Sequence, residues 1–93
     1  MSFHEQTRLE IDTLLRKAFA PLELEVVDES AAHRGHKEAV AHPGAGHFLV
    51  TMKSAQFDGK NPVQRHRLVY AELNALMESR IHALRLNLKA SNE

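Results

Sequence analysis

The N-terminal part of the chain has the apolar periodicity of a helix. Apolar residues recur at three- and four-residue spacing from Ile11 to Phe19, which places them on one buried face. Ser2 followed by Glu5 has the spacing of a capping box, in which each side chain satisfies a free backbone donor. Because proline cannot continue a helix, we expect this helix to end before Pro21.

Three segments alternate apolar and polar residues at every second position, as strands with one solvated face do. They are the segment that starts at Leu22 and residues 47–54 and 83–90. A second helix is expected between the last two strands. Asn61 and Pro62 have the chemistry of an N-cap and a first helical residue, and the apolar stripe that includes Tyr70 continues to about residue 79. A short helical turn is expected over residues 55–59.

The predicted order is therefore α-β-β-α-β in one domain over residues 1–93, with its core at about residues 3–90. The first two strands form an antiparallel hairpin, and the helix between the second and third strands returns the chain for a parallel neighbour. This predicts an α+β fold, a three-stranded mixed sheet with both helices on one face. The loop over residues 29–46 exceeds the ~12–15 residues at which structureless connections become uncommon, so we expect it to be mobile or to bind a ligand.

Composition narrows the chemistry available to the chain. Twelve basic and twelve acidic side chains give zero formal net charge, which argues against a strongly cationic nucleic-acid binder. The sequence has no cysteine, so thiolate metal sites and cysteine nucleophiles built from this chain alone are excluded. No apolar run approaches the ~18 residues of a membrane span, and we expect a cytoplasmic location.

Histidines are the first local feature that indicates chemistry. Seven occur in the chain, and four fall within fifteen positions: His33, His36, His42 and His47. Because the second and third strands start at the same end of the sheet, His82 should converge with this group. His66, on the second helix, should lie about 20 Å away by helix rise and is excluded as a co-ligand. His4 is expected to be solvated.

Three of these histidines also have a plain structural interpretation. His47 is compatible with the solvated face of its strand, His42 with a mobile surface segment, and His82 with a half-buried helix-to-strand junction. The ligands do not form a compact HxxxH or HxH motif. From spacing alone, a metal site and ordinary surface histidines both remain open.

A combination of motifs resembles the BolA-like proteins. The strings are LEVVDESAAH, HFLVTMKSAQFDGKNPVQRHRLVYAELNAL and IHALRLNL, which together cover about residues 22–88. The resemblance implies a class II KH-like fold and a partner of monothiol glutaredoxins that shares a bridging 2Fe–2S cluster, for iron–sulfur cluster trafficking or iron regulation. Carried over by motif, the ligands are His82 and His33. The long loop offers His36 and His42 as alternatives to His33.

Iron–sulfur ligation is compatible with a chain that has no cysteine. Imidazoles replace two cysteines on one iron in Rieske centres. In the implied complex the glutaredoxin and glutathione supply thiolates, and no cofactor is expected in the isolated chain, a monomer or weak homodimer. Ligation requires deprotonated imidazoles, so acid should release the cluster, and Asp28 and Glu29 are candidates to orient the rings.

The resemblance also implies an alternative, because the family is described as transcriptional regulators with a role in stress response. DNA would then bind a basic patch at the start of the second helix, made of Lys53, Lys60, Arg65, His66 and Arg67. The turn over residues 59–62 lacks the GxxG loop of KH domains, and zero net charge disfavours strong nonspecific phosphate binding. No phosphate-binding glycine loop or nucleophile–base pair is recognisable, so no enzymatic activity is expected.

Overall fold

The computed structural model describes residues 2–30 and 45–93 and contains two long helices and one sheet. The elements are α1 (Phe3–Phe19), β1 (Glu23–Asp28), β2 (Gly46–Lys53), η2 (Ala55–Phe57), α3 (Pro62–Met77) and β3 (Ile81–Lys89). The strand order is β1-β2-β3, with β1 antiparallel and β3 parallel to β2. This confirms the predicted α+β order and mixed sheet. The expected mobility of the loop concerns mainly residues 31–44, which lie outside the described residues.

Local capping signals account for the helix boundaries. Ser2 Oγ accepts the Glu5 backbone N–H at 3.1 Å, but the reciprocal half of the box does not form, because the Glu5 carboxylate binds Arg8. Helix α1 ends at Phe19, and Ala20 adopts a left-handed conformation with φ 43°. The helix thus ends before Pro21, as predicted.

Helix α3 begins with a complete capping box. Asn61 Oδ1 accepts the Gln64 backbone N–H at 2.8 Å, and Gln64 Oε1 accepts the Asn61 N–H at 2.9 Å. Pro62 is the first helical residue, where its missing N–H costs nothing. The helix ends at Met77, slightly before the predicted residue 79.

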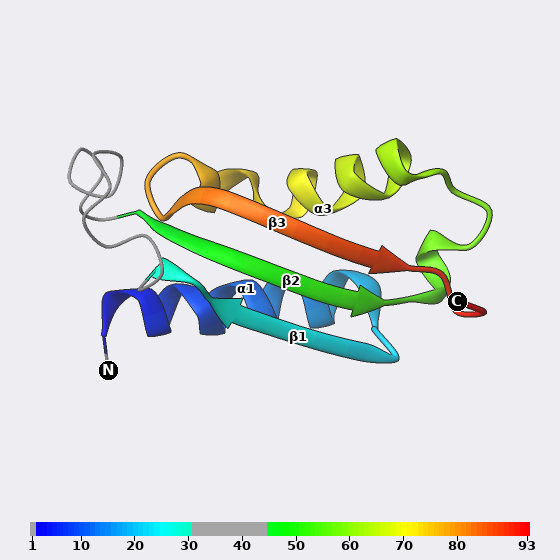
Figure 1. The fold of residues 1–93 in the computed structure, drawn as a ribbon, viewed down its shortest axis with the longest axis horizontal. Coiled ribbons are helices and arrows are strands. Elements are labelled where there is room, and N and C mark those ends of the chain that lie inside the picture. The colour runs from blue at the N-terminus through cyan, green and yellow to red at the C-terminus, as the bar shows by residue number, and fades with distance from the viewer. Residues whose placement is uncertain (1, 31–44) are drawn as a thin grey trace.

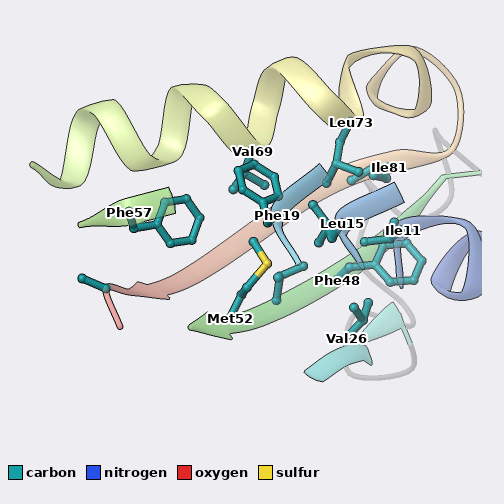
Figure 2. Packing of buried hydrophobic residues seen from close by; sticks show 12 residues of the cluster. Ile11, Leu15, Phe19, Val26, Phe48, Met52, Phe57, Val69, Leu73 and Ile81 are labelled. Atoms are coloured by element: carbon teal, nitrogen blue, oxygen red, sulfur yellow. The ribbon is translucent and has the colours of Figure 1, made fainter. Parts of the chain in front are cut away.

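Both helices cover the same face of the sheet and leave the other face uncovered by any helix of the described residues (Figure 1). Figure 2 shows side chains from α1, α3 and the sheet meeting between these layers. The rings of Phe19 and Phe57 lie 5.2 Å apart at one end of this core, and Phe48 is fully buried at the other. The buried core comprises Ile11, Leu15, Phe19, Val26, Phe48, Val50, Met52, Phe57, Val69, Leu73, Ile81 and Ala90.

Tyr70 does not face the core as expected. It is 39% exposed, and its hydroxyl donates to the Leu84 backbone carbonyl at 3.4 Å. Helix α3 lies along β3, one of the two edge strands, so part of the helix extends beyond the sheet (Figure 1). Val63, near the start of the same helix, is 56% exposed.

Ser91 and Glu93, at the end of the chain, are bonded to the body of the fold. Ser91 donates through its backbone N–H and its hydroxyl to the two Asp58 carboxylate oxygens, each at 2.7 Å. The Glu93 carboxylate accepts from Arg65 Nη1 at 2.6 Å and from the Ala90 N–H at 2.7 Å. These bonds join the C-terminal segment to the start of α3.

Candidate functional site

The parallel pairing of β2 and β3 brings two histidines together at one end of the sheet. Gly46 pairs with Ile81, so the two strands start side by side. The rings of His47 and His82 lie 5.1 Å apart between centroids and meet edge to face at 61°. The predicted convergence of these two residues is therefore confirmed.

A bulge in β3 decides the direction of His82. Leu84, Leu86 and Leu88 pack against the core, and strict alternation would place His82 on the same face. The register instead shifts between Gly46 and His47, so that His82 is the extra residue. Ile81 takes the core position, at 2% exposure, and His82 reaches the face of His47. The expectation that the strand begins after His82 is thus wrong, because β3 starts at Ile81.

His47 is far less exposed than its expected position on a solvated strand face implies. Only 6% of the residue is accessible, although alternation with the buried Phe48 places it on the face without helices. Its backbone N–H donates to Ser30 Oγ at 3.1 Å, and its carbonyl accepts the Glu29 N–H at 2.7 Å. The start of β2 is therefore fixed by the end of β1. His82 is half-buried, as its position at a helix-to-strand junction indicated.

The two acidic residues expected beside the imidazoles bind other groups. The Glu29 carboxylate accepts from Arg85 Nε and Nη2 at 3.1 and 3.2 Å. Asp28 Oδ1 accepts the Ser30 backbone N–H at 2.9 Å. Both carboxylates lie at the end of β1, close in register to His47, and they order the segment that holds its backbone.

Arg80 joins α1 to the start of β3, two residues before His82. Its Nε donates to Thr7 Oγ1 at 3.0 Å, its Nη1 pairs with Glu10 at 3.0 Å, and its guanidinium lies 4.4 Å from the centre of the Phe3 ring. The Arg80 carbonyl also accepts the Gly46 N–H at 3.1 Å. One side chain and its backbone thus connect α1 and both strand starts, a role the sequence did not reveal.

The remaining described histidines lie away from the pair. His4 was expected to be solvated but is half-buried on the helix-covered face, where its ring meets Phe48 edge-on at 6.4 Å. Its position at the first turn of α1, under the start of β2, explains the burial. His66 is exposed in the first turns of α3. The start of α3 lies at the opposite end of the sheet from the starts of β2 and β3 (Figure 1). Its exclusion as a co-ligand agrees with this placement.

The predicted loop ligands His33, His36 and His42 lie outside the described residues, so their role stays a prediction. Within residues 2–30 and 45–93, no group of three or more histidine and acidic side chains could hold a metal ion. His47 and His82 alone therefore make an incomplete site, and further ligands would have to come from the loop or from a partner.

The separation of the two rings fits ligation of a single metal ion. Imidazole nitrogens lie about 2.0–2.1 Å from a bound ion such as zinc, which puts the centres of two tetrahedrally placed rings about 5 Å apart. The observed 5.1 Å matches this value. Imidazoles also replace thiolates on one iron of a 2Fe–2S cluster in Rieske centres. Two imidazole donors therefore fit the 2Fe–2S cluster that the sequence resemblance implies.

The predicted basic patch at the start of α3 is smaller than the sequence indicated. Arg65 is only 12% exposed at its side chain and binds Glu93, the Lys60 carbonyl and the Leu88 carbonyl. Lys53 lies 3.9 Å from Glu23. His66 and Arg67 are exposed. Arg65 therefore has a structural role, which the sequence alone did not indicate because its acidic partner, Glu93, lies 28 residues further along the chain.

Comparison with known proteins identifies the family. The family profile described as BolA-like protein matches residues 15–93, and the chain belongs to this family. It is 39% identical to the Escherichia coli DNA-binding transcriptional regulator BolA over 80 residues, which are 86% of this chain and 71% of that protein. It is 40% identical to bovine BolA-like protein 1 over 74 residues, 80% of this chain and 51% of that protein.

Solved structures of BolA domains share the fold. The BolA domain of SufE1 from Arabidopsis thaliana superposes with a TM-score of 0.79 at 36% identity, covering 92% of this chain and 93% of that one. BolA1 from the same plant gives 0.77 at 32% identity, with the same coverage. The chain spans only 22% of the full Arabidopsis SufE-like protein 1, a chloroplastic/mitochondrial protein. No helix in the described ranges is long and apolar enough to cross a membrane, and the cytoplasmic location stays a prediction.

Proposed function

We propose that this chain is a non-enzymatic partner of a monothiol glutaredoxin and supplies histidine ligands to a shared 2Fe–2S cluster, for cluster trafficking or iron regulation. The observation that carries the proposal is the contact between the His47 and His82 rings. Two imidazoles with ring centroids 5.1 Å apart, and no group of three or more potential ligands within the described residues, suit a chain whose site a second protein completes.

The roles of this chain's residues follow from their positions. His82 is one ligand, and the second is His47 or, as the sequence resemblance implies, His33, with His36 and His42 as alternatives. The bulge in β3 and the bonds from Ser30 and Glu29 to the backbone of His47 hold the pair before a partner arrives. The cluster, with thiolates from glutaredoxin and glutathione, would supply the redox-active iron. A pre-arranged pair lowers the ordering cost of assembling the site.

Reconstitution tests this function directly. The purified chain is mixed with a monothiol glutaredoxin, iron, sulfide and glutathione, and absorption and circular dichroism are compared with those of the glutaredoxin alone. We expect a heterodimer with a distinct spectrum that His82→Ala abolishes. His47→Ala and His33→Ala identify the second ligand, and His66→Ala is the matched control. Identical spectra with and without this chain would contradict the proposal.

DNA binding is the second candidate, and it is favoured by the name of the Escherichia coli relative, a DNA-binding transcriptional regulator. Lys60, His66 and Arg67 would then contact phosphate, while Arg65 and Lys53 are already paired. Arg67→Gln should weaken DNA association and reduce its salt dependence. His82→Ala should leave DNA binding unchanged, so the same two variants separate the two functions. Salt-insensitive binding by both variants would argue against a phosphate contact.

A further inference from the structure

An ion pair crosses the uncovered face of the sheet beside the histidine pair. Arg85 lies on β3 in register with Leu49, whereas Glu29 follows β1 and bonds the backbone of His47. Their side chains meet through two hydrogen bonds at 3.1 and 3.2 Å. Since the outer strands are about 10 Å apart, at roughly 4.8 Å per strand spacing, the bridge must pass over β2 between the positions of His47 and Leu49.

The Arg85 side chain is exposed and can be reached by a group on another protein. The exposed fraction of this side chain is 68%, against 24% for Glu29. Nε and Nη2 donate to Glu29, and within the described residues Nη1 has no acceptor. Exposed ion pairs contribute little net stability, so an incoming carboxylate can share or replace Glu29 at small cost. Guanidinium groups are suited to such exchange because their planar fork matches a carboxylate.

We propose that Arg85 is a specificity-determining residue of this site, which binds a carboxylate brought by the partner that completes the histidine pair. Glu29 holds the guanidinium in position until that carboxylate arrives. The inference rests on the proposed function, because it takes the partner to approach the face on which His47 and His82 meet. A protein that approaches this face meets the exposed Arg85 side chain. A partner with an acidic group at that point therefore binds more tightly than a partner with a basic group.

Substitutions of Arg85 and of Glu29 should change the affinity for the partner in opposite directions. This difference distinguishes recognition of the partner from a purely structural role of the ion pair. Affinity is measured by calorimetric titration of the full chain with cluster-loaded monothiol glutaredoxin at several salt concentrations. We expect Arg85→Gln to weaken binding about tenfold or more and to flatten its salt dependence. Glu29→Gln should tighten binding by up to about fivefold, because it removes the competing carboxylate. Arg85→Lys should fall between wild type and Arg85→Gln.

If both Arg85→Gln and Glu29→Gln weaken binding equally, the bridge only stabilises the sheet and the inference is overturned. Unchanged affinity of Arg85→Gln also overturns it, provided that the wild-type complex forms. Failure of the wild-type chain to form the complex would instead contradict the proposed function. Arg16→Gln, which removes an exposed bridge to Asp12 on α1, is the matched control and should bind as wild type does.

The carboxylate has two chemical sources, an acidic side chain of the glutaredoxin or the glutathione bound with the cluster. Assembling the complex with 2-mercaptoethanol in place of glutathione distinguishes them, because this thiol has no carboxylate. If the effect of Arg85→Gln persists, the partner's side chain is the source. If Arg85→Gln weakens binding with glutathione but not with 2-mercaptoethanol, glutathione is the source of the carboxylate.

Discussion

The rings of His47 and His82 meet at 5.1 Å because β3 carries one extra residue opposite the step from Gly46 to His47. Without the extra residue His82 would share the core face with Leu84, and a buried imidazole there would need a hydrogen-bond partner in an apolar layer. The bulge therefore does two things. It gives Ile81 the core position, and it places a second imidazole beside the first.

The histidine pair should bind a divalent ion weakly in the isolated chain. We expect Zn²⁺, followed by NMR of the imidazole ring protons, to shift His47 and His82 together. His47→Ala or His82→Ala should weaken this binding about tenfold or more, because one of two ring ligands is lost. His66→Ala is the control. Equal weakening by His66→Ala would mean that zinc binds histidines nonspecifically.

Gly46 should tolerate no larger residue. A Cβ added there would lie 2.7 Å from Phe48 Cε2 and 2.9 Å from His4 Nδ1. We expect Gly46→Ala to lower the free energy of unfolding by about 1–3 kcal/mol, as overpacking does, in urea denaturation. It should also shift the His4 and His47 resonances.

Gly59→Ala provides the comparison for Gly46. This position has φ 74° but no atom within 4 Å of an added Cβ, so the cost is backbone strain of about 1–2 kcal/mol. The His47 resonances should stay in place in this variant. A shift of these resonances in Gly59→Ala but not in Gly46→Ala would contradict the contact geometry.

Arg80 should stabilise the fold and keep the histidine pair in register. Arg80→Met keeps the aliphatic stem but removes the bonds to Thr7 and Glu10 and the cation over Phe3. We expect a loss of about 1–3 kcal/mol in unfolding free energy. The nuclear Overhauser contact between the His47 and His82 rings should weaken at the same time. Arg16→Met, at an exposed bridge, should cost less than about 1 kcal/mol and leave that contact intact.

The bonds of the C-terminal segment should weaken in acid. The Arg65 side chain lowers the pKa of Glu93, chiefly through a hydrogen bond, and the Ser91 backbone N–H lowers the pKa of Asp58. A carboxyl whose folded pKa is depressed stabilises the fold above its unfolded pKa, and this contribution is lost as the pH falls through the folded value. Protection of the Ser91–Glu93 amides against hydrogen exchange, measured relative to the intrinsic exchange rate at each pH, should therefore decrease below about pH 4.5, the ordinary pKa of glutamate.

Variants at the same bonds check this acid response. Glu93→Gln should lose the part of the pH dependence that comes from the Arg65 bond, whereas Asp58→Asn should lose the part that comes from Ser91. Arg65→Gln should resemble Glu93→Gln. An unchanged pH profile in all three variants would show that these bonds do not form in solution.

Most of the secondary structure could be predicted because its signals are local. Asn61 and Gln64 cap α3 through bonds within one turn, and the pattern from Ile11 to Phe19 marks one face of α1. The parallel order of β2 and β3 followed from the helix between them, and with it the meeting of His47 and His82. The exposure of Tyr70, by contrast, depends on how far α3 overhangs the edge strand, which no local pattern encodes.

The sequence alone determined the helices, the strands, the mixed sheet and the meeting of His47 and His82 at one end, because caps, periodicity and connection length act over a few residues. Only the tertiary structure decided which way His82 faces, because the bulge exists only when β3 pairs with β2. It also decided that Arg65 is bound by Glu93 and that Arg85 reaches Glu29 across the sheet. Each of these pairs joins residues that become neighbours only when distant segments pack, so their spacing in the chain carries no signal.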